Sequence, residues 1–126
     1  MNVNAVIGLR AGDTDQVRAI KVFSEHTDPF LLGYVLLSFY QKRTCTLPLV
    51  LGGSAESIGE TFLSTRYNKL EESQFYNTAH SLTFKNCDSK FFYVQDTDNT
   101  WYVCFGEPDK WIRLDSIVTG VSYEQP

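Results

Sequence analysis

The residues that could act as a nucleophile and base are few, and their positions decide which chemistry they could support. A cysteine hydrolase needs a thiolate beside a histidine that a third group orients. Two pairs could meet this need, Cys45 with His80 and Cys87 with His80. No spacing in the sequence singles out either pair. We therefore expect these residues to be structural, and we predict no catalytic residue.

Two other patterns look like ligand sites. His26 and Asp28 lie two residues apart, but zinc sites place short-spaced ligand pairs on each of two segments. Residues 52–59 look like a phosphate loop, which requires Lys and then Ser or Thr after its last glycine. Glu60 and Thr61 stand there instead. We expect Asp28 to cap a helix and the glycines to end one, and we predict neither a metal nor a cofactor.

Acidic residues gather in three predicted turns, and an acidic face is one possible binding surface. If the three turns share one end of a sheet, they form a negative face that mimics a nucleic-acid backbone or docks on a basic protein. Acidic residues in turns are more often simple turn formers that keep a surface soluble. The three pairs are Asp13 and Asp15, Asp96 and Asp98, and Glu107 and Asp109.

Aromatic residues make up 14% of the chain, and some of them lie in a segment without clear periodicity. Arg66, Tyr67, Phe75 and Tyr76 are of the types enriched at protein interfaces. The alternative is a satellite cluster that holds a long loop in place. Together with the acidic turn that contains Asp96 and Asp98, this segment gives the predicted partner-binding residues. They are Arg66, Tyr67, Phe75, Tyr76, Asp96 and Asp98.

The composition is that of a globular chain. The 126 residues include 43% hydrophobic and 21% charged residues, which fits one domain spanning residues 1–126 with a loose tail at about 121–126. The formal net charge is −4. Direct nucleic-acid binding is not expected, because it needs a basic surface that displaces phosphate counterions.

The expected location is the cytoplasm. The first apolar run is too short for a signal peptide and has no basic residue before it. The longest apolar stretch, residues 30–40, has about half the ~20 residues that span a bilayer. Three cysteines without a CxxC pair fit a reducing compartment, where we expect them to pack as small apolar side chains. We expect no membrane contact, and the oligomeric state is left open.

The first half of the chain predicts a hairpin followed by helices. Residues 3–9 and 16–24 read as antiparallel strands around a polar turn. Asp28 is a good N-cap and Pro29 suits the first helical position, which predicts a helix over residues 29–42. Gly33 inside this helix indicates close backbone packing. A second, short helix is expected from a Thr46 cap to residues 52–53, and a further short turn after Ser54.

The second half predicts mainly strands. We expect residues 60–77 to be irregular, with one helical turn near residues 69–74. Residues 81–84 read as a short strand, and residues 90–95 and 100–105 as an aromatic hairpin around a four-residue turn. Residues 111–114 read as an edge strand, followed by a turn capped by Asp115. The predicted fold class is α+β, an antiparallel sheet of about five strands with one main helix and short helices packed on one face.

The order of these features resembles a protein family. His26, Asp28 and Pro29 follow a hairpin and precede a helix that contains Gly33 and ends in Tyr40. A turn over residues 53–59, with glycines at both ends and serines at positions 54 and 57, and the Trp-Tyr of the aromatic hairpin at positions 101–102 come next. In this order the chain is similar to small uncharacterised accessory proteins of tailed bacteriophages and prophages. The resemblance implies a phage or prophage origin but no activity and no functional residue.

Together these patterns favour a non-enzymatic accessory protein of phage type that binds and inhibits a host protein or a defence component. One alternative is a small-ligand or nucleotide-binding domain, with possible hydrolytic activity, at the end of the sheet near Arg10, His26 and His80. Another is a structural component of the virion, which would self-associate.

Overall fold

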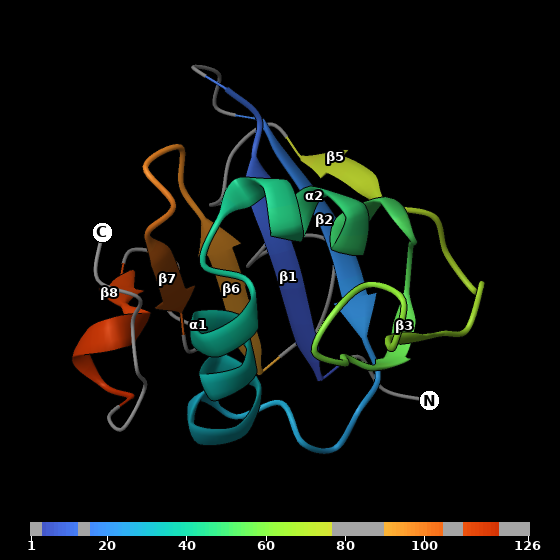
Figure 1. Ribbon diagram of the computed structural model, residues 1–126, viewed down its shortest axis with the longest axis horizontal. Coiled ribbons are helices and arrows are strands. Elements are labelled where there is room, and N and C mark those ends of the chain that lie inside the picture. Colours follow the sequence, from blue (N-terminus) through green and yellow to red (C-terminus); the bar gives the residue numbers. More distant parts are fainter. Residues whose placement is uncertain (1–3, 13–15, 77–89, 105–109, 119–126) are drawn as a thin grey trace.

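A mixed sheet of eight strands runs through the centre of the molecule (Figure 1). This computed structural model describes residues 4–12, 16–76, 90–104 and 110–118. The strand order is β4-β3-β2-β1-β6-β7-β8, and β5 pairs with β2 beside this path. The strands are β1 (Ala5–Arg10), β2 (Val17–Val22), β3 (Ala55–Ser57), β4 (Arg66–Tyr67), β5 (Gln74–Tyr76), β6 (Phe91–Gln95), β7 (Trp101–Cys104) and β8 (Ile112–Arg113).

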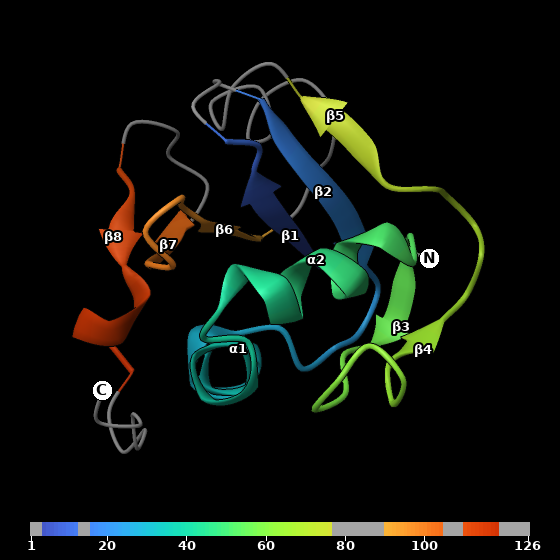
Figure 2. The same cartoon turned by 45° about the horizontal axis from the view of Figure 1, so that its top comes forward.

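Within the described ranges, two α-helices and two short helical turns accompany the sheet. The π-helical turn η1 (Pro29–Gly33) leads directly into α1 (Tyr34–Phe39), and α2 (Arg43–Leu51) follows. The 3₁₀ turn η2 (Leu114–Ser116) comes after β8. Figures 1 and 2 show α1 and α2 on the same side of the sheet. None of the helices in the described ranges has the length and apolar character that crossing a bilayer requires.

The α+β class is confirmed, whereas the expectation of a purely antiparallel, five-stranded sheet is wrong. The hairpins β1–β2 and β6–β7 are antiparallel as predicted. However, β1 pairs in parallel with β6, and β2 in parallel with β3. Parallel neighbours need a crossover connection, and η1, α1 and α2 provide it between β2 and β3. The local turn signals of the sequence identify hairpins but not these long-range pairs.

The segment 60–77 is also corrected. In place of a helical turn near residues 69–74, it forms β4 and β5. β4 pairs with β3, and β5 pairs with the first half of β2. Both strands are two or three residues long, and their pairing partners lie elsewhere in the chain, so local periodicity does not reveal them. The predicted strand 81–84 and the tail 121–126 lie outside the described residues.

The first helical segment begins as predicted and ends early. The Asp28 carboxylate accepts hydrogen bonds from the backbone N–H groups of Phe30 (2.9 Å) and Leu31 (3.1 Å). The helix ends at Phe39, not at residue 42, because the Tyr40 carbonyl is turned to the sheet. There it accepts hydrogen bonds from the Trp101 indole (2.8 Å) and from the Gln95 amide (3.1 Å).

The second helix starts four residues earlier than expected. Lys42 is the N-cap residue, so Thr46 lies inside α2 and is buried. Its hydroxyl contacts the Gln95 side chain at 2.5 Å instead of capping the helix. Gly52 ends α2 as predicted, and Gly53 adopts a left-handed conformation with φ of 87°. Ser54 caps no helical turn, since the chain enters β3 directly after it.

Two apolar clusters fill the two faces of the sheet. On the helix side, Leu36, Leu49 and Tyr93 are among the buried residues of the larger cluster. Val6, Val17 and Phe92 belong to the cluster on the opposite face. The alternation of side chains along β1 and β6 divides them between the clusters. The apolar side of the helical segments therefore packs against one face of the sheet.

Close packing at η1 explains Gly33. A Cβ atom on Gly33 would lie 2.9 Å from Cδ1 of Leu114, so any larger residue here would force the Leu114 side chain of η2 to shift. The prediction of close backbone packing at this residue is confirmed. Asp115, predicted to cap the turn, lies inside η2, and its carboxylate pairs with Arg113 at 2.7 Å.

Candidate functional site

The outward side of the helical segments carries almost no charge. η1 and α1 contain no charged residue, and α2 contains only Arg43. A surface helix normally turns charged and polar side chains to water and apolar ones to the core. Here large apolar side chains also point outward. We call this set the helix-layer surface: Phe30 (70% exposed), Leu31 (47%), Tyr34 (42%), Phe39 (40%), Leu47 (44%) and Leu51 (53%).

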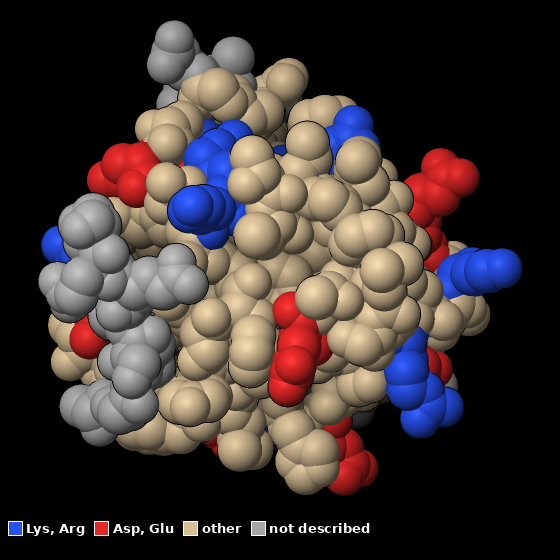
Figure 3. All heavy atoms as spheres, viewed as in Figure 1, with Lys and Arg blue, Asp and Glu red and all other residues tan. Residues whose placement is uncertain are grey.

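The core does not need these residues, because other residues of the same segments already fill it. Leu36 and Leu49 are fully buried, and Leu37 is 4% exposed. Figure 3 shows the face over the helices as largely uncharged, with basic atoms gathered near the N-terminal end of α2. Exposed apolar patches of this kind mark interaction sites in soluble proteins. The helix-layer surface is therefore the strongest candidate for a binding surface among the described residues.

A groove of about 440 Å³ borders this surface along α2. We call it the arginine groove. Leu47 and Leu51 of α2 and Phe75 of β5 give it apolar walls, and its cationic lining residues are Arg10, Arg18 and Arg43. The Arg18 guanidinium lies over the Phe75 ring, 4.4 Å from the ring centroid. It also donates a hydrogen bond to the Ser73 hydroxyl at 3.3 Å.

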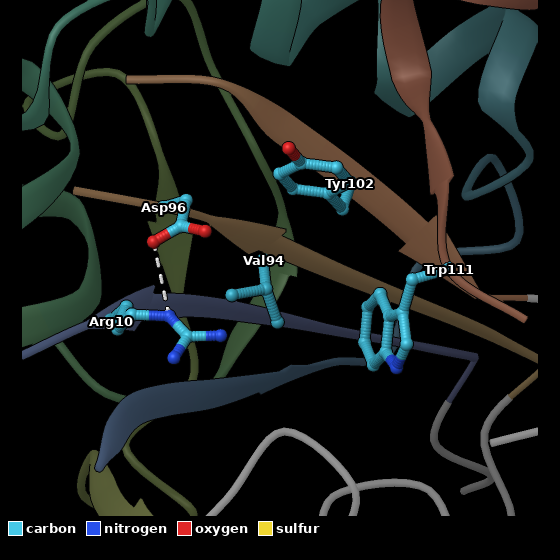
Figure 4. Close-up of a pocket in the computed structure, with 5 residues that line it drawn as sticks. All are labelled: Arg10, Val94, Asp96, Tyr102 and Trp111. Atoms are coloured by element: carbon cyan, nitrogen blue, oxygen red, sulfur yellow. Dashed lines mark ion pairs between the residues drawn. The ribbon is translucent and has the colours of Figure 1, made fainter. Parts of the chain in front are cut away.

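The opposite face of the sheet holds a smaller pocket of about 210 Å³ (Figure 4). Val94 lies between an aromatic pair, Tyr102 and Trp111, and an ion pair, Arg10 and Asp96. Arg10 Nε and Asp96 Oδ1 are 3.1 Å apart. Because β1 and β6 are parallel neighbours, this pair joins the ends of two adjacent strands. Its charges are compensated within the protein, so we assign it a role in holding the strand ends together.

The predicted binding residues of the 66–76 segment do not form one surface. Tyr76 is 8% exposed and belongs to the cluster on the far face of the sheet. Tyr67 is half-buried, and its hydroxyl donates a hydrogen bond to the Leu49 carbonyl at 2.6 Å. Arg66 is exposed on β4. Phe75, which is 53% exposed, is the one member of this group that lines the arginine groove.

The predicted acidic turns are described only in part. Asp13, Asp15, Glu107 and Asp109 lie outside the described residues. Asp96 belongs to the ion pair with Arg10. Asp98 is exposed, and a hydrogen bond from the Thr100 backbone N–H (3.0 Å) lowers the pKa of its carboxyl. These two residues act as turn formers, as the simpler interpretation of acidic turns expects.

The residues considered for catalysis and metal binding are not brought together where the structure describes them. Cys45 is exposed on α2, which corrects the expectation that all three thiols pack in the interior, whereas Cys104 is buried. His80 and Cys87 lie outside the described residues. Across the described ranges, no three His, Cys, Asp or Glu side chains gather in a group that could hold a metal ion.

Three buried or half-buried tyrosines link the helices, strands and loops through their hydroxyl groups. Tyr40 donates to the Gly59 carbonyl (2.7 Å) and Tyr93 to the Thr27 carbonyl (2.6 Å). Desolvation by burial raises the pKa of both phenols. Burial also raises the pKa of Tyr67 to about 12. These hydroxyls stay protonated near neutral pH and serve as structural donors.

Sequence reasoning missed the helix-layer surface, although the signal is present in the sequence. Residues 29–55 include only two charged residues, Lys42 and Arg43. We assigned all apolar residues of this stretch to the side of the helix that packs on the sheet. A helix needs only one apolar side for that purpose. The lack of charge on the remaining side is the observation that could have identified an exposed binding surface.

Comparisons with protein-family models, with curated proteins and with solved structures give no match for this chain.

Proposed function

We propose that the protein is a non-enzymatic binding protein of phage type, which covers and inhibits a host protein through its helix-layer surface. The observation that carries this proposal is the near-absence of charge on helical segments whose outer side is exposed. Burying such apolar surface against a partner is favourable by about 25 cal/mol for each Å² removed from water.

The types of the exposed residues support a protein partner. Phe30 and Tyr34 are large aromatic side chains, and aromatic residues are enriched at the energetic centres of protein interfaces. They lie on a helical segment that is fixed by the Asp28 cap and by packing of Leu36 and Leu37 against the sheet. A surface held rigidly in this way loses little conformational entropy on binding. The expectation of a bacterial host protein comes from the resemblance to phage accessory proteins.

The experiment is capture and measurement of a defined partner. Tagged full-length protein is incubated with bacterial host extract, the partner is identified by mass spectrometry, and its affinity is measured with purified components. We expect a stoichiometric complex that weakens at least tenfold with Leu31→Glu, because this change places a charge on the apolar surface that the partner covers. Activity of the purified partner, measured with and without the protein, tests inhibition.

Leu70→Glu is the matched control. Leu70 is 60% exposed and lies outside the helical segments, so its substitution should leave the affinity unchanged. Circular dichroism and thermal unfolding establish that both variants fold. Unchanged affinity of the Leu31→Glu variant would contradict the proposal. Concentration-dependent oligomers that Leu31→Glu abolishes would also contradict it, since they would assign the surface to self-assembly.

A further inference from the structure

The arginine groove combines apolar walls with cations in a way that points to a particular partner chemistry. Leu47, Leu51 and Phe75 are 44%, 53% and 53% exposed, so each offers apolar surface to a bound molecule. These residues come from two elements, α2 and β5. Leu47 and Leu51 are one helical turn apart, which places them on the same side of α2.

Three arginines line the groove, and two of them, Arg18 and Arg43, have no acidic partner among the described residues. Arg18 contacts the Phe75 ring and the Ser73 hydroxyl. Arg43 donates hydrogen bonds to the main-chain carbonyls of Arg10 and Asp96, which carry no net charge. By contrast, Arg10, Lys21 and Arg113 each pair with a carboxylate. In a chain with a net charge of −4, Arg18 and Arg43 thus place two guanidinium groups without a carboxylate partner beside one apolar groove.

Both guanidinium groups are held in place before any partner arrives. Stacking over Phe75 orients Arg18, and the two carbonyl contacts orient Arg43 at the N-terminus of α2. A preorganised guanidinium loses less freedom when it binds, and its planar donors match the two oxygens of a carboxylate. The walls between them accept aliphatic or aromatic side chains. A ligand that satisfies both features carries carboxylates and apolar groups in alternation.

We propose that the arginine groove binds an acidic and apolar peptide segment of the partner protein. The apolar side chains of this segment pack on Leu47, Leu51 and Phe75, and its carboxylates pair with Arg18 and Arg43. This inference rests on the proposed function and adds the chemistry of the partner. A nucleic acid would use the arginines but would leave the aliphatic walls without a matching group.

The test is a direct binding measurement with probes of defined chemistry. The probe is a fluorescein-labelled 12-residue peptide in which Glu alternates with Leu, and fluorescence anisotropy is recorded with the full-length protein. Comparison peptides replace Glu by Lys or Leu by Ser, and a labelled 12-nucleotide single-stranded DNA serves as the nucleic-acid probe. We expect saturable binding of the Glu-Leu peptide, at least tenfold tighter than any comparison probe and weakened by added salt.

Matched variants locate the binding to the groove. Arg18→Gln and Leu51→Ser should each weaken binding of the peptide at least fivefold. Arg66→Gln and Leu70→Ser make the same changes on exposed residues outside the groove and should have no effect. Because Leu51 is half-exposed, its substitution is compatible with folding, which thermal unfolding verifies. Equal weakening by the control variants, or tighter binding of the DNA, would overturn the proposal.

The same variants separate this proposal from the proposed function. If the partner is lost with Leu31→Glu but retained at full affinity with Arg18→Gln and Leu51→Ser, the groove proposal fails and the proposed function stands. If the peptide binds in the groove while Leu31→Glu retains the partner, the assignment of the helix-layer surface fails. The first outcome therefore contradicts only the groove proposal, and the second contradicts only the assignment of the helix-layer surface.

Discussion

The helix-layer surface and the pocket on the opposite face of the sheet differ in whether their charged side chains pair with an opposite charge. In the far pocket, Arg10 faces Asp96 at 3.1 Å, so the cation and the anion belong to the same chain. Beside the helix-layer surface, Arg18 and Arg43 meet only neutral groups among the described residues, and apolar side chains point to water. The comparison indicates that one face uses its charges to hold the fold, while the other leaves them available to a partner.

The largest expected effect is a difference in stability between substitutions on the buried side and on the exposed side of one helical segment. Leu36 is fully buried, whereas Leu31 is 47% exposed. Leu36→Ala should reduce the free energy of unfolding by about 2–5 kcal/mol, because it removes buried methyl groups and leaves a cavity. Leu31→Ala should change it by no more than about 0.5 kcal/mol. Denaturant titration of both variants measures the difference, and similar losses would show that the outer side is part of the core.

The buried tyrosines predict a loss of stability in alkali. Their pKa values in the folded protein are raised above the value of about 10 in the unfolded chain, so the unfolded state releases protons first. Their contribution is complete below pH 10 and is lost as the pH rises further. For the fully buried Tyr93, each pH unit above 10 should lower the free energy of unfolding by about 1.4 kcal/mol, and Tyr40 should add to this loss.

Urea unfolding between pH 8 and pH 12 measures this slope. Tyr67→Phe removes one of the three titrating groups, so the stability of this variant should fall less steeply between pH 10 and pH 12 than that of the unmodified protein. A slope that is identical in the two proteins would show that Tyr67 ionises alike in the folded and unfolded states.

A smaller effect is expected from the ion pair in the far pocket. Both side chains are 32% exposed, and partly exposed ion pairs contribute about 1 kcal/mol or less. A double-mutant cycle with Arg10→Gln and Asp96→Asn should therefore give a coupling of up to about 1 kcal/mol. Asp96→Asn by itself should leave partner affinity unchanged, because the Asp96 side chain lines the far pocket, whereas Arg10 also lines the arginine groove. A loss of affinity would contradict the division between the two faces.

The sequence predicted those elements whose signals are local. The Asp28 cap, the two antiparallel hairpins, the helix stop at Gly52 and the close packing at Gly33 each depend on residues within a few positions of one another. The candidate site was predicted only in fragments. Of the six proposed partner-binding residues, Phe75 lines the arginine groove, while Tyr76 is buried and Asp96 pairs with Arg10. Whether a residue is exposed depends on which distant segments of the chain pack against it. Local sequence patterns carry no information about those contacts.

The amino-acid sequence by itself determined the α+β class, the local turns and the low charge of residues 29–55. The tertiary structure decided that β1 and β6 are parallel neighbours, that β4 and β5 join the sheet, and that α1 ends at Phe39. It also decided which apolar side chains remain at the surface. The physical reason is that caps, turns and glycine conformations are set by near neighbours. Strand pairing and burial are set by contacts between distant segments, which exist only once the chain has folded.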